Sequence, residues 1–213
     1  MKSERMAPAL VELRKRHREI RQLIRSRLDD FARVPPDEYF YELVYCLLTP
    51  QSKAEHAERV IDLLREHRFA ETGFDPEQFL RDRTHYIRFH RTKARYLLEA
   101  RTAFPAIHRR IANDPGAQEL REWLVGNVNG LGQKEATHFL RNIGRNEGLA
   151  ILDRHILRNL KRYGVIRTLS PSLSRKRYLS IEQRFQSFAE TIGIPLDELD
   201  LLFWSMETGQ IRK

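Results

Sequence analysis

The sequence predicts an all-α fold, and three observations carry that prediction. Apolar residues recur at spacings of three and four along most of the chain, which is the period of an amphipathic helix. Proline and glycine interrupt these stretches at intervals that suit helices of roughly 8 to 20 residues. No stretch shows the sustained apolar-polar alternation, bounded by hairpin turns, that is typical of a β-sheet.

The first predicted helix has an apolar stripe made of Leu10, Leu13, His17, Ile20, Ile24, Leu28 and Phe31. Pro35-Pro36-Asp37 ends this helix and begins a second one that continues through Leu48. Thr49-Pro50 breaks the chain again. A third helix follows, with a predicted buried face made of Ala54, Ala57, Val60, Ile61 and Leu64. Asp75-Pro76-Glu77 begins a further helix with proline in its first turn, where the missing N–H has no partner to lose.

The rest of the chain also reads as helices separated by proline or glycine. The predicted helices are 91–103, 117–128, 133–143, 154–163, 174–192 and 197–208. The breaks between and after them are Phe104-Pro105, Asp114-Pro115-Gly116, Gly164, Gly193-Ile194-Pro195 and Gly209. The sequence contains no repeat of fixed period and no low-complexity segment, so solenoid architectures are excluded.

Composition excludes several classes of protein. With 213 residues, 41% hydrophobic and 31% charged, the chain suits one domain or two small lobes and is not disordered. The longest apolar run, Leu43 to Leu48, falls far short of the ~20 residues of a membrane span. The first residues lack an apolar signal core, so we expect a cytoplasmic protein. The single Cys46 excludes an intrachain disulfide and a four-cysteine iron–sulfur cluster.

The charge balance favours a polyanionic partner. Lys and Arg number 38 against 29 acidic residues, a net charge of +9, and residues 81–110 carry nine basic residues against two acidic ones. Such a surplus attracts phosphates and steers their approach. An ordinary Arg-rich solvated helix surface is the alternative explanation, and charge alone does not decide between them.

The most specific segment is 119–144, where Asn129-Gly130-Leu131-Gly132 joins two predicted helices. Its glycines permit positive φ and leave backbone N–H groups uncovered, so a phosphate can sit against them and the second helix's positive end. The segment is not a dinucleotide fingerprint, because a helix precedes it and the third glycine is missing. No phosphate-loop motif occurs in the chain. A tight helix–helix turn without function is the alternative.

Two residues near this hairpin are candidates for catalysis. Lys134 lies in the first turn of the second helix, where the helix dipole disfavours the ammonium form and partial burial would make the amine a nucleophile. A surface lysine that contacts phosphate is the alternative. Asp153 follows nineteen residues later and precedes another helix. It can be an N-cap, a catalytic carboxylate, or both, since a cap holds the carboxylate rigid.

These residues resemble a known family. Residues 129–136, followed by Leu152-Asp153-Arg154-His155, resemble the helix-hairpin-helix and Gly/Pro…Asp signature of base-excision DNA glycosylases. The most similar branch is the short, second-branch 8-oxoguanine DNA glycosylase/lyase. The likeness extends over most of the chain, through Leu47–Ala54, Arg88–Ala94, and Leu201–Gly209 with terminal Lys213.

The resemblance implies a fold and a binding partner, and it implies that some groups found in related enzymes are absent. It implies one glycosylase unit over 1–213, made of two helical lobes: about 53–149, with the hairpin at 119–144, and 1–52 plus 150–213. It implies no iron–sulfur cluster and no cofactor. His85, His90 and His155 do not form a metal-ligand set with acidic residues at fitting spacings, so we expect no catalytic metal, whereas a structural cation bound by the hairpin carbonyls stays open. The expected partner is double-stranded DNA containing 8-oxoguanine, bound by a monomer without any membrane association.

The resemblance also implies a chemical role for individual residues. Lys134 would attack the anomeric carbon of an extruded nucleoside and form a Schiff base, and β-elimination would then cut the strand on the 3′ side. Asp153 would stabilise the positive charge that develops on the sugar. The family's base pocket corresponds to Phe89, Trp204 and Lys213, whose terminal carboxylate matches the N1–H and N2–H donors of guanine. The DNA-binding residues that it implies are Gln51, which fills the gap in the base stack, and Arg88, Asn129, Gly130, Gly132 and Arg154.

Two other functions remain open. An enzyme of the same superfamily that acts on oxidised pyrimidines fits the same motifs. A non-catalytic helix-hairpin-helix module would explain the charge and the glycines, but it gives no reason for Lys134 and Asp153 to occur together.

Overall fold

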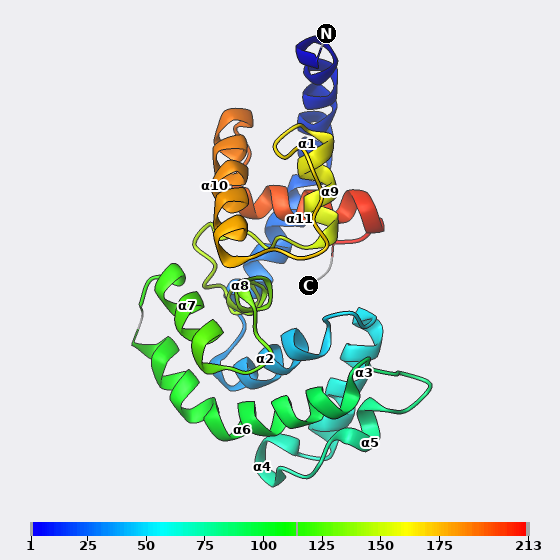
Figure 1. The fold of residues 1–213 in the computed structure, drawn as a ribbon, viewed down its shortest axis with the longest axis vertical. Coiled ribbons are helices and arrows are strands. Elements are labelled where there is room, and N and C mark those ends of the chain that lie inside the picture. The colour runs from blue at the N-terminus through cyan, green and yellow to red at the C-terminus, as the bar shows by residue number, and fades with distance from the viewer. Residues whose placement is uncertain (1, 114, 212–213) are drawn as a thin grey trace. The chain divides into compact units, whose positions relative to one another are not determined.

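Every regular element in the part of the chain that the structure describes, residues 2–113 and 115–211, is a helix (Figure 1). The structure is a computed structural model. Its elements are α1 (Lys2–Ala32), η1 (Pro36–Glu38), α2 (Tyr39–Leu48), α3 (Ala54–Glu66), α4 (Phe69–Thr72), α5 (Glu77–Leu80), α6 (His90–Ala112), α7 (Ala117–Asn127), α8 (Gln133–Asn142), α9 (Arg154–Arg162), α10 (Arg175–Ile192) and α11 (Leu196–Thr208). The predicted all-α class is confirmed. None of the helices described is both long and apolar enough to cross a membrane.

The chain forms two compact units. The first consists of Met1–Arg33 and Asn146–Lys213, and the second is Val34–Arg145. The lobes that the resemblance implies differ from this division at two places: residues 34–52 belong to the central unit, and residues 146–149 belong with the two ends of the chain. The reason for the first difference is packing: α2 lies against α3, α6 and α8, all of which belong to Val34–Arg145.

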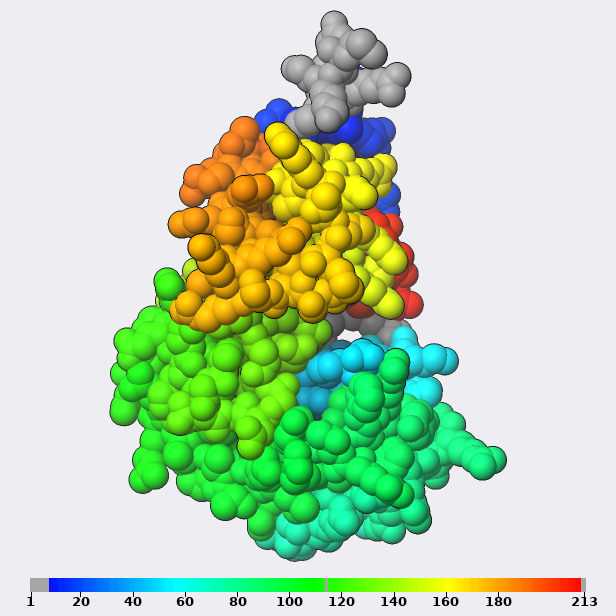
Figure 2. Space-filling view, in the orientation of Figure 1, coloured from blue at the N-terminus to red at the C-terminus, as the bar shows by residue number. Residues whose placement is uncertain are grey.

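The core of the first unit is built around α11, which is apolar on most of its faces. Leu199, Leu201, Leu202 and Phe203 are all fully buried, because α1, α9 and α10 each pack against this helix. The Phe203 ring stacks on Tyr163 at 5.4 Å between centroids. In Figure 2 the yellow and orange surface of this unit comes from α9, α10 and the loop between them.

The second unit is built around α2, which explains the short apolar run at Leu43–Leu48. All six of these residues are buried, and α6 and α8 contact the helix that carries them. A surface helix would show one apolar stripe, whereas α2 is apolar on nearly every face because neighbours surround it. The six-residue run therefore marks a core helix and not a membrane segment.

The predicted break at Phe104-Pro105 is wrong, because α6 continues through Pro105 to Ala112. A proline inside a helix costs about 3 kcal/mol or more, since it removes one hydrogen bond and crowds the preceding turn. Ile107 and Ile111 lie beyond it and are buried on the same helix, so their packing offsets this cost. Figure 1 shows that α6 is bent, as a proline inside a helix causes.

Candidate active site

The glycine hairpin between α7 and α8 is shaped by Gly130. Its φ is +92°, and a Cβ built there would lie 2.6 Å from Cδ2 of Tyr96 and 3.0 Å from Cδ2 of Leu47. Both the backbone conformation and the close approach therefore require glycine. Next to it, Asn129 donates a side-chain hydrogen bond of 2.9 Å to Glu99 on α6. These contacts fix the hairpin against the rest of its unit.

We expect Gly130→Ala to lower the free energy of unfolding by about 2 kcal/mol or more, because the new methyl group combines left-handed strain with a clash against Tyr96. Gly126→Ala is a matched control on the neighbouring α7. Nothing lies within 4 Å of a Cβ at this exposed helical position. There the same change is expected to stabilise the protein by about 0.5–1 kcal/mol. Urea denaturation of both variants checks the prediction, and equal effects at the two positions would contradict it.

Lys134 lies in the first turn of α8, where Glu135 holds it in place. Its Nζ is 3.0 Å from Oε1 of Glu135, and 31% of the lysine side chain is exposed. The other carboxylate oxygen of Glu135 accepts a 3.3 Å hydrogen bond from the N–H of Gly132, the residue that caps the helix. Glu135 therefore joins the lysine to the hairpin. The sequence analysis missed it, although an acidic residue at the third helical position is a known capping signal.

Gln51, Arg88 and Phe89 lie on two turns that are joined to each other. Oγ of Ser52 accepts a 3.0 Å hydrogen bond from the N–H of Arg88, which ties the turn after α2 to the turn before α6. The Arg88 guanidinium lies 4.8 Å from the centroid of the Phe89 ring. Phe89 is 49% exposed, which is unusual for a large apolar side chain. An exposed aromatic ring beside a cation can stack on a base.

Lys93 belongs to the basic run and to the motif Arg88–Ala94, but no role was predicted for it from the sequence. It is 5% exposed, and its Nζ donates to the carbonyls of Leu48 at 2.6 Å and Pro50 at 2.7 Å and to Oγ of Ser52 at 3.2 Å. Burial, and next the positive charge of Lys134, lower the pKa of Lys93 to about 8. The sequence could have indicated that Lys93 is buried, because it lies beside Ala94 on the buried face of α6.

The basic residues at the start of α6 are available to bind phosphates. Side chains of Arg91 and Arg95 are 84% and 66% exposed, although each lies near one carboxylate, at 3.5 Å from Glu77 and 3.6 Å from Glu99 respectively. Arg88 is also exposed, just before the helix begins. Exposed ion pairs of this kind contribute little to stability, so a phosphate can replace either carboxylate.

Replacing any two of Arg88, Arg91 and Arg95 by alanine should weaken binding to lesion-free and lesion-containing DNA alike. The slope of log affinity against log salt should flatten by about 0.9 for each phosphate contact that is lost. Arg109→Ala with Arg110→Ala is the matched control, because it removes the same charge from the other end of α6. Titrations at several salt concentrations measure the slope. If the control pair changes the slope as much as the first pair, the effect is one of net charge.

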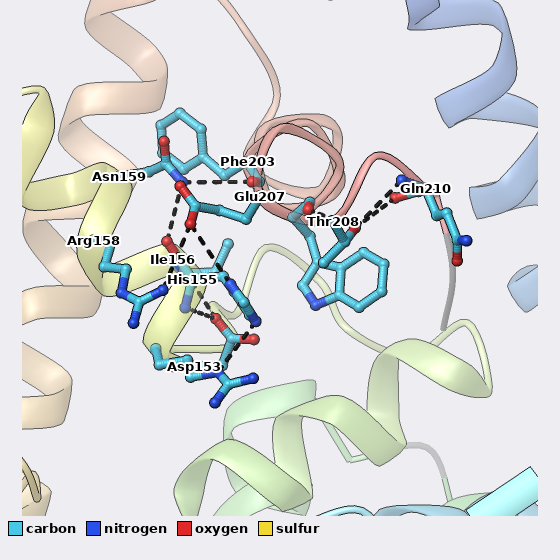
Figure 3. Close-up of polar contacts among 11 residues, drawn as sticks. Asp153, His155, Ile156, Arg158, Asn159, Phe203, Glu207, Thr208 and Gln210 are labelled. Carbon is cyan, nitrogen blue, oxygen red and sulfur yellow. Dashed lines mark hydrogen bonds and ion pairs between the residues drawn. The ribbon is translucent and has the colours of Figure 1, made fainter. Parts of the chain in front are cut away.

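Asp153 is the N-cap of α9, as one of the two interpretations predicted. Its Oδ1 accepts hydrogen bonds from the backbone N–H groups of His155 and Ile156, both at 2.8 Å (Figure 3). Two amides therefore hold one carboxylate oxygen in a fixed direction. The carboxylate is half-buried, and the cap keeps it rigid at the positive end of the helix.

His155 connects this cap to Trp204 on α11. The two rings meet edge to face, with centroids 6.3 Å apart and planes at 73°. Nε2 of His155 accepts a 3.3 Å hydrogen bond from Nε of Arg154, and Oε2 of Glu207 lies 3.8 Å from its Nδ1. The structure therefore gathers Asp153, Arg154 and Trp204 around one histidine. Neither His155 nor Glu207 was predicted as a site residue, although both lie within the sequence motifs quoted above.

Asn159 and Thr208 fix the end of α11 beside this cluster (Figure 3). The side-chain amide of Asn159 donates to the carbonyls of His155 and Phe203 and to Oε1 of Glu207, at 3.1, 3.4 and 3.3 Å. Oγ1 of Thr208 donates a 2.9 Å hydrogen bond to the carbonyl of Trp204 and accepts one of 3.3 Å from the N–H of Gln210. The predicted pocket residue Lys213 lies beyond residue 211, outside the described residues.

The residues singled out from the sequence thus fall into two groups, one on each unit. Those of the Val34–Arg145 unit are Gln51, Arg88, Phe89, Asn129, Gly130, Gly132 and Lys134. Those of the other unit, among described residues, are Asp153, Arg154 and Trp204. Among residues 2–113 and 115–211, no three His, Cys, Asp or Glu side chains are grouped so as to hold a metal ion. A glycine hairpin with an adjacent lysine, together with an aspartate that caps a later helix, defines the class of helix-hairpin-helix DNA glycosylases.

Comparison with known proteins narrows this class to one family. The family model described as 8-oxoguanine DNA glycosylase matches residues 24–194. An 8-oxoguanine DNA glycosylase/AP lyase of Fusobacterium nucleatum is 39% identical, over 95% of this chain and 96% of that protein. One from Korarchaeum cryptofilum is 41% identical, over 91% and 92%. The chain belongs to the 8-oxoguanine DNA glycosylase family.

Two solved structures have the same fold as this chain. The crystal structure of the 8-oxoguanine DNA glycosylase of Thermotoga maritima superposes with a TM-score of 0.85 at 32% identity, covering 98% of this chain and 100% of that one. The 8-oxoguanine glycosylase/lyase of Methanocaldococcus jannaschii, in complex with a 15mer DNA containing 8-oxoguanine, gives 0.85 at 32% identity, covering 96% and 99%.

Proposed function

We infer that this chain is a base-excision repair enzyme that removes 8-oxoguanine from DNA and then cleaves the strand at the abasic site. The observation that carries this inference is Lys134, held in the first turn of α8 by Glu135 beside the glycine hairpin, in a chain of this family. A lysine amine and a carboxylate on a helix cap are the two groups that a combined glycosylase and lyase needs.

In the proposed mechanism the enzyme first extrudes the damaged nucleotide from the duplex, because its anomeric carbon cannot be reached inside the stack. Nζ of Lys134 then attacks C1′, and the C1′–N9 bond breaks with its electron pair leaving on the base, which takes up a proton. The amine and the opened sugar form a Schiff base. Loss of a proton from C2′ expels the 3′ phosphate by β-elimination, and the strand is cut.

Asp153 supports this chemistry electrostatically. The sugar gains positive charge as the base departs, and a carboxylate held by two backbone amides stabilises that charge without reorganising. The lysine without the aspartate would be a phosphate contact. The aspartate without the lysine would suit an enzyme that activates water. The two residues therefore belong to one mechanism.

The remaining site residues bind the DNA and the extruded base. The exposed ring of Phe89 and the half-buried Trp204 offer flat faces that replace the stacking lost on extrusion, worth about 1–3 kcal/mol per base. Gln51 fills the vacated place in the stack, and Lys213 reads the guanine edge. Exposed Arg88 and Arg154, with the backbone N–H groups of Asn129 and Gly130, contact phosphates. Gly132 supports this DNA-binding hairpin through its shape, because its own N–H donates to Glu135.

Comparing duplexes that contain 8-oxoguanine or thymine glycol tests this function against its nearest rival. Preferential cleavage of the 8-oxoguanine duplex is the expected result, whereas preference for thymine glycol would identify an oxidised-pyrimidine enzyme. Borohydride trapping on the same duplexes separates both from a non-catalytic DNA-binding module, since only a Schiff base becomes covalently linked. We also propose a cytoplasmic, nucleoid-associated location in a prokaryotic cell, because the DNA substrate lies there.

A further inference from the structure

We propose that Lys93 and Ser52 form a buried clamp that positions Gln51 and Phe89 for base extrusion. This inference rests on the proposed function, and it assigns the two residues a positioning role and not a catalytic one. All four residues belong to the Val34–Arg145 unit.

The clamp joins two turns that are distant in the sequence. Lys93, on the first turn of α6, donates hydrogen bonds to the carbonyls of Leu48 and Pro50, on either side of the α2 terminus, and to Oγ of Ser52. The same Oγ accepts the N–H of Arg88, at 3.0 Å. One hydroxyl therefore receives hydrogen bonds from the residue before Phe89 and from the lysine one turn after it.

The two residues that the clamp supports both have strained backbones. Gln51 has φ of +57° and Phe89 has φ of +61°, in the left-handed region that non-glycine residues avoid. Strain of this kind costs about 1–3 kcal/mol at each residue and persists only where the surroundings hold it. Each strained residue lies immediately beside a group of the clamp, since Gln51 lies between Pro50 and Ser52, and Phe89 follows Arg88. Both side chains are exposed, so the strain presents them outward.

Burying the charged Lys93 costs more free energy than burying an apolar side chain that would fill the same space. Lys93 is 5% exposed, and in the described part of the chain its hydrogen-bond acceptors are two carbonyls and one hydroxyl, all of them uncharged. A buried cation whose hydrogen-bond acceptors are all uncharged loses more hydration energy than a buried apolar side chain, and the nearby charge of Glu135 offsets part of that loss. Its pKa, lowered to about 8 chiefly by burial, reflects that cost. Three N–H donors directed at three acceptors provide in return a rigid junction of the two turns.

The test uses Ser52→Ala and Lys93→Met, which remove the clamp from either side, and Ser52→Thr, which keeps the hydroxyl. Arg101→Met is the matched control: Arg101 is also on α6 and also donates to backbone carbonyls, those of Ala70 and Glu71 in the short helix α4, and neither of these hydrogen bonds involves Gln51 or Phe89. Each variant is assayed for single-turnover release of 8-oxoguanine, for cleavage of a preformed abasic site, for thermal unfolding and for hydrogen exchange at the Arg88 amide.

Ser52→Ala and Lys93→Met should slow 8-oxoguanine release about tenfold or more, a loss of about 1.4 kcal/mol in the barrier. Cleavage of the abasic site by Ser52→Ala should change by less than about threefold, because no base has to be gripped there. This comparison uses Ser52→Ala because the charge of Lys93 also acts on Lys134. Ser52→Thr should release 8-oxoguanine at the wild-type rate, because it keeps the hydroxyl. Hydrogen exchange at the Arg88 amide should speed up only in Ser52→Ala, which removes the acceptor of that amide. The proposal is overturned if both activities fall together, in parallel with thermal stability and with Arg101→Met, or if neither changes. A wild-type enzyme that releases no 8-oxoguanine would instead overturn the proposed function and this inference together.

Discussion

Lys134→Gln is expected to abolish both strand cleavage and covalent trapping by borohydride while leaving DNA affinity within about threefold of wild type. Glutamine keeps the length and polarity of the side chain, but its amide has no nucleophilic lone pair and cannot form a Schiff base. The loss should exceed that of any other single substitution, because both strand cleavage and trapping require an amine that attacks the sugar. Gel separation of the trapped complex and of the cleaved strand measures both activities on one duplex.

Lys176→Gln is the control for this experiment. Lys176 is exposed on α10, so the substitution removes the same charge from the chain outside the candidate site. It should retain both activities. Trapping by the Lys134→Gln variant at the wild-type level would show that another amine attacks the sugar.

Asp153→Asn should reduce the rate of 8-oxoguanine release by about a hundredfold or more, with little change in stability. Asparagine caps a helix about as well as aspartate, so the hydrogen bonds to His155 and Ile156 can remain. The lost negative charge acts mainly on the cationic transition state, which is why the effect appears in the rate of the chemical step. Binding is expected to tighten slightly, since one negative charge leaves a site that faces phosphates.

Asp75→Asn is the control for Asp153→Asn, because it changes an aspartate that also bonds to a backbone amide but lies outside the proposed mechanism. Asp75 also accepts a backbone N–H with its carboxylate, from Glu77 at 2.9 Å, in the turn before α5. It should leave 8-oxoguanine release unchanged, because that turn holds no residue of the proposed mechanism. If Asp153→Asn releases the base as fast as wild type, with its helix content intact by circular dichroism, Asp153 serves only as a helix cap.

The sequence was most informative where local chemistry determines structure. Gly130 and Gly132 indicated the hairpin in the sequence. The structure gives the reason for Gly130, which approaches Tyr96 so closely that only glycine has space there. Asp153 predicted the start of α9 for a similarly local reason, since the carboxylate bonds to amides two and three residues ahead. Such features depend on a few neighbouring residues, and a single sequence displays them directly.

Features that depend on tertiary packing were predicted less well. Pro105 has the local signature of a helix end, yet the buried side chains of Ile107 and Ile111 carry α6 past it. The boundary near residue 52 was an implication of the family resemblance and not a reading of local chemistry. The structure divides the chain at Val34 because α2 packs on α3, α6 and α8.

Site residues that act through other residues were also missed. Ser52 and Lys93 are 41 positions apart, and nothing in the sequence links a hydroxyl in one turn to a lysine in a basic helix. His155 and Glu207 come from α9 and α11 and meet only in the folded unit. Glu135 was the exception, since its place at the third position of α8 could have been noticed.

The most direct test of the account is to locate the amine that becomes bound to DNA. The wild-type protein is incubated with a duplex containing 8-oxoguanine opposite cytosine, reduced with borohydride, digested, and the modified peptide is sequenced by mass spectrometry. We expect the sugar remnant on Lys134, in the peptide that contains the start of α8. Attachment to Lys93, whose pKa is lowered to about 8, or to any other lysine would contradict the assignment of the nucleophile. A protein that forms no adduct at all would contradict the proposed activity itself.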